Sequence, residues 1–67
     1  MKWYWIVVWA RATGTSDGND SGTIRSQAFN SELDARTNLD ARLNQSVPDI
    51  KLPRGAYIVS YSVELKR

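Results

Sequence analysis

The side chains of this chain that could take part in catalysis are mainly carboxylates and hydroxyls, because the sequence contains neither histidine nor cysteine. Nucleophilic catalysis needs a base beside the nucleophile, and histidine is the usual one. Two carboxylate pairs remain as candidates for general acid–base work, Asp34 with Asp40 and Asp17 with Asp20. The first pair is six residues apart and does not share a helix face; the second lies in a polar stretch without the burial that catalytic carboxylates need. We therefore expect no enzyme and no catalytic residue.

The stretch from Asp17 to Ile24 spaces its oxygen-bearing side chains like a calcium-binding loop. The relevant residues come in loop order: Asp17, Asn19 and Ser21, then Gly22, then Ile24. This spacing resembles the first two thirds of an EF-hand loop, with oxygen ligands at positions one, three and five and glycine at six. Position twelve departs from the family, because it is Ala28 and not a bidentate glutamate, and a strand replaces the entering helix. We expect no metal and no cofactor.

Three tryptophans and an arginine recur at alternate positions near the start of the chain: Trp3, Trp5, Trp9 and Arg11. Alternate residues of a strand share one face, so this row offers rings on which bases stack and a cation for phosphate. Five further basic residues are available nearby: Arg25, Lys51, Arg54, Lys66 and Arg67. Three exposed tryptophans would, however, form a patch at or above the ~300–600 Å² typical of a monomer's largest. Burial under a helix is our first interpretation, and single-stranded nucleic acid is the alternative.

The row belongs to an unbroken apolar run, Trp3–Ala10, rich in β-branched and aromatic residues. Eight apolar residues are too few to cross a bilayer as a helix, and this composition predicts a strand, from about Lys2 to Ala12. Both of its faces are apolar, which places it in the middle of a sheet. The run ends in Ala10-Arg11-Ala12, the outline of a secretory cleavage site, but it is short and tryptophan-rich for a signal peptide. We expect it to be retained, and the protein to be cytoplasmic without membrane contact.

A polar stretch, 13–22, predicts a loop, and Thr23–Ala28 predicts a short edge strand that returns to the first. A helix follows, from Glu32 to about Asn44, with Ser31 as its N-cap. Its buried stripe is expected to be Ala35, Leu39 and Leu43, with Leu33 beside it, and Phe29 is expected to pack at its start while Pro48 prevents its continuation.

The last strand shows the clearest alternation in the chain. Tyr57, Val59, Tyr61, Val63 and Leu65 alternate with Ile58, Ser60, Ser62, Glu64 and Lys66, which predicts one buried and one wet face. A turn at Pro53–Gly55 precedes it. The predicted fold is a single α+β domain, residues 1–67, of order β-β-α-β, with a three-stranded antiparallel sheet in order 2-1-3 and one helix on one face. If 23–28 is loop, the alternative is a β-α-β unit that requires dimerisation.

A single helix covers one face of the sheet, so the other face of the first strand stays apolar. That face is either the tryptophan row or Tyr4, Ile6 and Val8 with Ile58, and something should cover it. Self-association as a homodimer is our first candidate and a different protein is the second. The candidate partner-binding residues are Trp3, Trp5, Trp9, Arg11, Arg36 and Arg54. Arg36 belongs to this set because arginine is favoured at interfaces.

Net charge and chain length narrow the classes of function but do not identify one. The net charge is +2 over 67 residues with both signs interspersed, which is too mild to indicate nucleic acid alone. The most economical interpretation is a small, non-catalytic protein-binding protein. Domains of this kind are common among accessory proteins of phages and other mobile elements, including inhibitors. The alternatives are a single-strand nucleic-acid-binding protein and a purely structural homo-oligomer.

Overall fold

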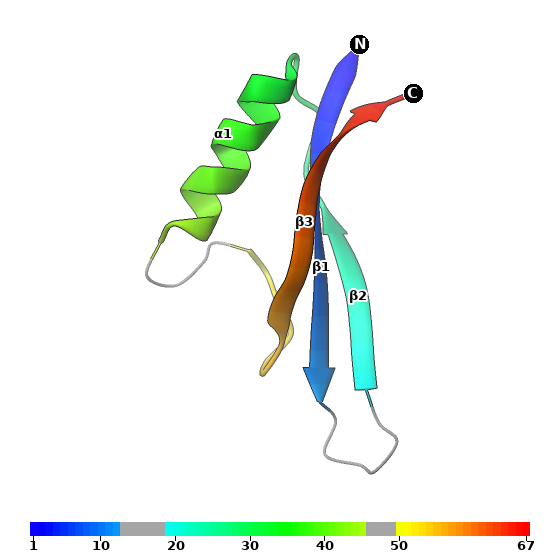
Figure 1. Ribbon diagram of the computed structural model, residues 1–67, viewed down its shortest axis with the longest axis vertical. Coiled ribbons are helices and arrows are strands. Elements are labelled where there is room, and N and C mark those ends of the chain that lie inside the picture. The colour runs from blue at the N-terminus through cyan, green and yellow to red at the C-terminus, as the bar shows by residue number, and fades with distance from the viewer. Residues whose placement is uncertain (13–18, 46–49) are drawn as a thin grey trace.

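The computed structural model describes residues 1–12, 19–45 and 50–67. Its elements are β1 (Lys2–Ala12), β2 (Asn19–Arg25), α1 (Glu32–Leu43) and β3 (Tyr57–Lys66). The strands form one sheet in order β2-β1-β3, and both pairings are antiparallel. The helix lies against one face of that sheet (Figure 1). The predicted α+β fold, its strand order and its pairing directions are confirmed.

The central strand has the predicted bounds, and its two faces differ in cover. On the inner face, which is the helix side, Trp5 and Val7 are buried. They form a core with Leu39 of α1 and Ile50. The tryptophan row therefore faces the helix, as first interpreted.

The second strand begins and ends earlier than predicted, at Asn19 and Arg25 and not at Thr23 and Ala28. Ser26 leaves the regular ladder because its side-chain Oγ accepts the Trp5 N–H at 2.9 Å while its own N–H donates to the Trp5 carbonyl at 3.0 Å. Phe29 then forms an isolated bridge to Trp3 and packs against the core. Of the predicted 13–22 loop, residues 13–18 lie outside the described residues.

The helix follows its capping signals. The Ser31 side chain accepts the Asp34 N–H at 3.0 Å, which supplies one of the partners that the first turn lacks. Ala35 and Leu39 are buried and Leu43 packs against the core, as predicted. Leu33 is 71% exposed, so its predicted place beside the stripe was wrong. Two residues span about 200° of helix, which turns position 33 away from position 35.

The segment between α1 and β3 completes the inner layer. Ile50 belongs to the core and Leu52 packs against it, which the loop-like sequence did not predict. The predicted turn at 53–55 is present: the Ala56 N–H donates to the Pro53 carbonyl at 3.0 Å, and Gly55 has φ +80°, a conformation that glycine adopts without steric cost. Pro48, expected to limit the helix, lies outside the described residues.

The third strand contains an irregularity that its sequence pattern concealed. The register of β1 with β3 shifts between Val8 and Trp9, where Val8 pairs with Ser60 and Trp9 with Ile58. Val59 is the extra residue of this bulge. As a result Ile58 joins the core side, whereas Tyr57, opposite Ala10, lies on the outer face. The expected uniform buried face from Tyr57 to Leu65, with Ile58 opposite, was wrong.

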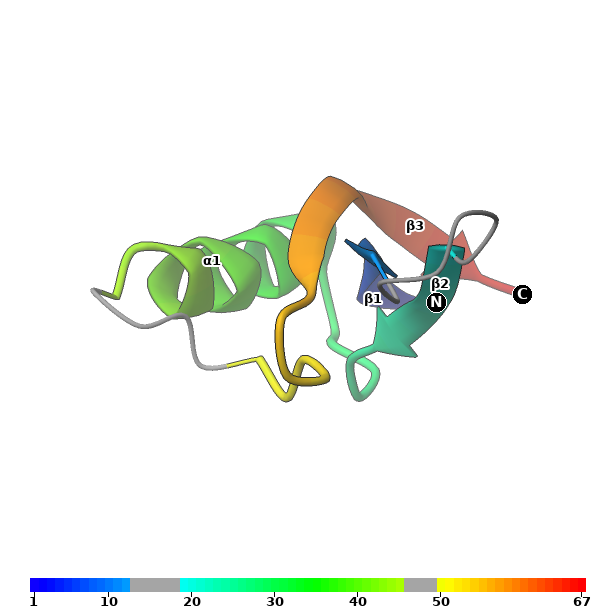
Figure 2. The same cartoon turned by 90° about the horizontal axis from the view of Figure 1, so that it is seen from below.

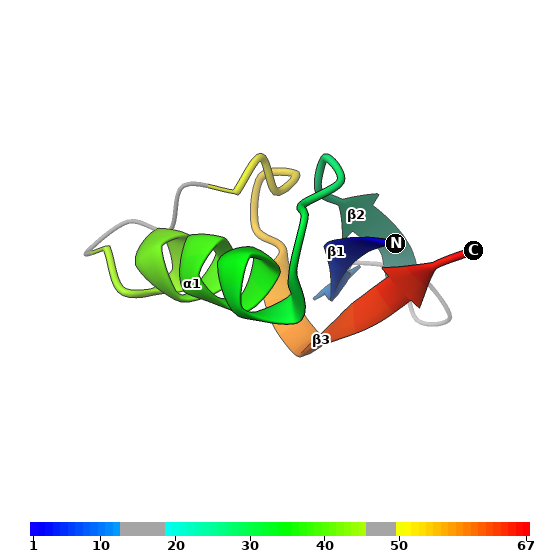
Figure 3. The same ribbon diagram turned by 90° about the horizontal axis from the view of Figure 1, so that it is seen from above.

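Two layers give the molecule an open shape (Figures 2 and 3): α1 and the 50–56 segment on one side, the bare sheet on the other. The radius of gyration is 13.4 Å, compared with about 11 Å for a compact domain of this length. The accessible surface is 5020 Å², compared with roughly 4300 Å² for a monomer of this mass. The fold therefore leaves about 700 Å² more surface exposed than its size requires.

Candidate functional site

The tryptophan row, the first candidate site from sequence, is built into the inner layer. Trp5 is 4% exposed, and its indole Nε1 donates to Asn38 Oδ1 at 2.9 Å. Arg42 Nε donates to the same oxygen at 3.1 Å, and its guanidinium lies 5.9 Å from the Trp5 ring centroid. Trp3 and Trp9 are half-buried. Trp5 thus belongs to the core and offers no surface to a partner while α1 is in place, whereas Trp3 and Trp9 remain partly exposed.

Trp9 covers the backbone of β2. A Cβ added at Gly22 would lie 2.6 Å from Trp9 Cζ2 and 2.8 Å from Cε2, far inside contact distance. The indole ring therefore rests on the glycine that pairs with it across the strands. An aromatic side chain that shields a strand glycine in this way is a recognised sheet-stabilising device.

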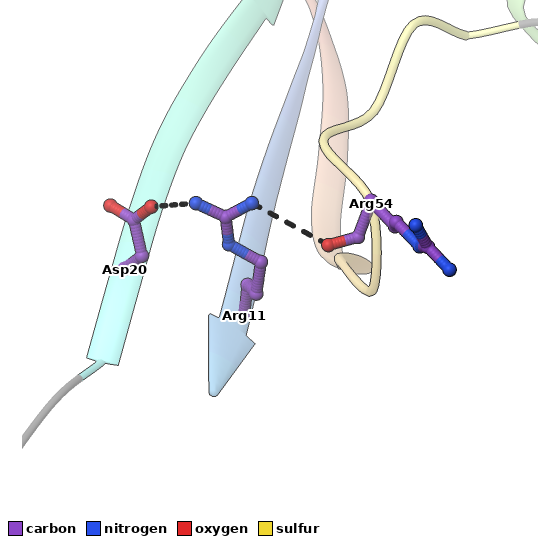
Figure 4. Close-up of polar contacts among 3 residues, drawn as sticks. All are labelled: Arg11, Asp20 and Arg54. Atoms are coloured by element: carbon purple, nitrogen blue, oxygen red, sulfur yellow. Dashed lines mark hydrogen bonds and ion pairs between the residues drawn. The ribbon is translucent and has the colours of Figure 1, made fainter. Parts of the chain in front are cut away.

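Arg11 sits at the far end of the same row and holds three segments together (Figure 4). Its Nη2 contacts Asp20 Oδ2 at 2.5 Å, and its Nη1 donates to the Arg54 carbonyl at 3.5 Å, the outer limit of hydrogen-bond distance. The Arg54 side chain points away from this contact (Figure 4). Because the Arg11 and Asp20 side chains are 33% and 43% exposed, solvent screening limits their ion pair to about 1 kcal/mol at most. Arg11 therefore ties β2 to the turn before β3.

Arg36 is exposed on α1, apart from the other candidates. With Asp40 and Tyr61 it lines a hollow of about 90 Å³ between the helix and β3. The six predicted partner-binding residues are therefore divided: four follow the inner face of β1, Arg54 contributes its main chain to one of these, and Arg36 stands at the β3 edge. They do not form one site.

The outer face of the sheet carries the surface that remains apolar. Along β1 it presents four half-buried side chains: Tyr4, Ile6, Val8 and Ala10. Their cross-strand neighbours, all exposed, are Arg25, Thr23 and Ser21 on β2 and Glu64, Ser62, Ser60 and Tyr57 on β3. No helix of the described residues covers this face (Figure 3). Short serine and threonine side chains border the apolar stripe and leave it accessible.

One corner of the outer face is basic. Here a hollow of about 370 Å³ is lined by Tyr4, Arg25, Ser26, Ala28, Lys66 and Arg67. The Arg25 guanidinium lies 5.9 Å from the Tyr4 ring centroid, at the limit of a cation–π contact. Glu64, opposite Tyr4, is the neighbouring carboxylate, and its Oε2 accepts from Ser62 Oγ at 3.4 Å. Three cations facing one carboxylate leave this corner with excess positive charge.

The sequence contained a signal for this corner. Period-two alternation turns Tyr4 away from the tryptophan row, and order 2-1-3 places Arg25 and Lys66 beside the Tyr4 end of β1. From sequence alone these basic residues are expected beside the tryptophan row, because its three indoles are the strongest aromatic signal in the chain.

The described parts of the chain contain neither a cluster of acidic residues that could hold a metal ion nor a helix that could span a membrane. Within residues 1–12, 19–45 and 50–67, no group of three or more acidic residues is arranged to hold a metal ion. Of the EF-hand-like stretch, Asp17 and Gly18 lie outside the described residues, while Asp20 is paired with Arg11 and 19–25 form β2. The helix in the described portion is neither long enough nor apolar enough to cross a membrane.

Comparison of the chain with protein-family models, with curated proteins and with solved structures finds no match in any of the three. The case for function therefore rests on the geometry of the faces described above.

Proposed function

We propose that this chain is a small non-catalytic accessory protein that binds another protein on the outer face of its sheet, the mode of action of an inhibitor or modulator. The observation that carries the proposal is the bare apolar stripe along β1: Tyr4, Ile6, Val8 and Ala10. Contiguous apolar surface on a small protein marks an interaction site. The surplus of accessible surface over that of a compact monomer supports the same interpretation.

The charge of the outer face indicates what kind of protein fits. The basic corner consists of Arg25, Lys66 and Arg67, and Glu64 is the carboxylate beside it. A partner with negative charge would balance the remaining positive charge. If two copies met face to face, each basic corner would lie opposite either the same basic corner of the second copy or the far end of its stripe. The first arrangement brings like charges together, and the second offers no carboxylate, because Ala10 and its neighbours are uncharged. The partner is therefore a different protein, with an apolar ridge and carboxylates at one end of it. Complementary charge of this kind fixes register and speeds association.

Nucleic acid, the alternative, requires rings spaced for successive bases. Tyr4 and Tyr57 are the aromatic residues of the outer face, and Tyr57 pairs with Ala10, six residues along β1 from Tyr4. That separation is about 20 Å at ~3.4 Å per residue, with aliphatic side chains between. The burial of Trp5 removes the indole stack on which the alternative depended. Both observations favour a protein partner.

The test is site-specific photo-crosslinking in the cells that naturally make the protein. A benzophenone amino acid replaces Val8 on the outer face or, as the matched control, the exposed Thr37 of α1. Adducts are identified by mass spectrometry, and the crosslinked residue of the partner is mapped. We expect a discrete protein adduct from position 8 and none from position 37, with the crosslink in an apolar patch beside aspartate or glutamate.

Charge reversal provides the second arm of the test. Arg25→Glu with Lys66→Glu should reduce the adduct yield from position 8, because the corner then repels the partner's carboxylates. The proposal is overturned if position 8 gives no more adduct than position 37, if the adduct contains only a second copy of this chain, or if nucleic acid is the crosslinked species.

A further inference from the structure

The sheet has a long free edge along β3. Among the described residues β3 pairs with β1 and with no other strand. Figure 1 views the sheet from this side, with β3 nearest the reader and α1 to the left of the strand, not in front of it. An uncovered edge strand presents unpaired main-chain groups and is a template for pairing with another strand.

The register shows which main-chain groups point outward. The Trp5 N–H and carbonyl are both engaged by Ser26, on the β2 side. Adjacent residues of an antiparallel strand point their groups to opposite sides, so Tyr4 and Ile6 turn theirs toward β3. Their partners there are Glu64 and Ser62. The main-chain groups of the residues between and beside these two, Tyr61, Val63 and Leu65, therefore point away from the sheet.

The side chains of this edge are suited to contact as well. Tyr57, Val59 and Tyr61 are three of the most exposed large hydrophobic residues, at 60%, 58% and 55%. Natural edges are commonly protected by lysine, proline or a bulge. The bulge at Val59 disrupts only the first part of β3, and the sequence from Ser60 to Val63 contains neither charge nor proline. The opposite edge, β2, is shorter, with 7 residues compared with 10 in β3.

We propose that β3 pairs antiparallel with β3 of a second copy, which joins two sheets into one of six strands in order 2-1-3-3-1-2. With the two-fold axis at Val63, Tyr61 faces Leu65 of the second copy through outward main-chain groups on both sides. The remaining pairs are Ser62 with Glu64 and Ser60 with Lys66, so no two like charges oppose each other. The same surface patch serves both copies, as a two-fold interface requires.

Register and orientation favour a second copy as the occupant. The hollow lined by Arg36, Asp40 and Tyr61 lies along the same edge, between the helix and β3. A two-fold axis normal to the sheet puts both helices on one side and both outer faces on the other. The edge pairing therefore leaves the proposed partner face free and is independent of it.

Single cysteines test the pairing directly, because the chain contains none. Ser62→Cys places a thiol next to the two-fold axis, and Ser21→Cys places one at an equally exposed serine of β2. The two Ser62→Cys thiols are diagonal neighbours across the axis, too far apart for an unstrained disulfide, so a short bis-maleimide linker is used. With this linker we expect Ser62→Cys to form covalent dimers and Ser21→Cys to remain monomeric. Equal yields from the two positions, or dimers from Ser21→Cys alone, would overturn the proposal.

Sedimentation equilibrium of the cysteine-free protein is the second readout. Tyr61→Glu puts an unpaired carboxylate into the contact and should raise the dimer Kd about tenfold or more. Tyr57→Glu, a matched change in the same strand but outside the paired register, should leave it unchanged, as should Val8→Asp on the outer face. A wild-type protein that stays monomeric at every concentration, or a dimer weakened by Val8→Asp and not by Tyr61→Glu, contradicts edge pairing. If position 8 of the otherwise unchanged protein crosslinks no partner while the dimer forms as described, the proposed function is contradicted and edge pairing stands.

Discussion

Replacing Gly22 by alanine tests the packing of Trp9 on β2, because two opposing effects can be separated. Gly55 is the described glycine with positive φ, so the Gly22 backbone is one that alanine adopts without strain. On backbone entropy alone, Gly22→Ala should stabilise the fold by about 0.4–1 kcal/mol through the unfolded chain. The new Cβ, however, would stand 2.6 Å from Trp9 Cζ2, and an overpacked contact costs about 1–3 kcal/mol. The net expectation is a loss of about 1–2 kcal/mol of unfolding free energy.

The assay is urea unfolding followed by far-UV circular dichroism, in wild-type and Trp9→Val backgrounds. Without the indole ring the clash disappears, so Gly22→Ala should change sign and stabilise the Trp9→Val protein by about 0.4–1 kcal/mol. The coupling energy of this double-mutant cycle should be about 1–3 kcal/mol. If Gly22→Ala stabilises both backgrounds equally, the ring does not rest on Gly22 and the reasoning is refuted.

Three further substitutions test the inner layer by the same unfolding assay. Asn38→Ala leaves the buried Trp5 indole N–H without its acceptor and should cost about 1–3 kcal/mol, whereas the neighbouring exposed Thr37→Ala should stay within about 0.5 kcal/mol; equal effects would mean that the hydrogen bond adds nothing. Ser31→Ala removes the N-cap and should cost about 1 kcal/mol with a loss of helical signal, and an unchanged midpoint would contradict the cap. Ile50→Ala should cost about 2–5 kcal/mol because the side chain is buried in the core, and a cost typical of a surface site would place this segment outside it.

The sequence predicted what local chemistry determines. The apolar run fixed the central strand from Lys2 to Ala12, and the serine followed three residues later by an aspartate fixed the start of the helix at Glu32. Both signals lie within a few neighbouring residues. The strand order followed from them, because a central strand with two apolar faces needs a neighbour on each edge.

Features that depend on contacts between distant segments were not predictable. The bulge at Val59 arises from the register of β3 against β1, and the alternation of Tyr57 to Leu65 gave no sign of it. Ile50 looked like a loop residue, because only the path from helix to strand brings it onto the core. The ion pair of Arg11 with Asp20 depends on the register of β1 against β2, which the sequence did not reveal.

The candidate site could be predicted only in part, for the same reason. Alternation showed that one face of β1 had to remain uncovered, and the sequence named Tyr4, Ile6 and Val8 as one of the two possibilities. Which face the helix takes depends on packing: Trp5 enters the core on the helix side, while Trp3 and Trp9 stay half-buried on the same face. The basic corner could be predicted only from the registers of both strand pairs together, because its residues come from three strands and from the chain after β2.

Solvent accessibility of individual methyl groups, measured by NMR with a soluble gadolinium probe, tests the central claim that the face opposite the helix is the working surface. The spectra are compared for the free protein and for its complex with the crosslinked partner. We predict that the Ile6 and Val8 methyls are accessible in the free protein and protected in the complex, while Leu33, exposed on α1, stays accessible in both. Protection of Leu33 with Ile6 and Val8 still accessible would contradict the account.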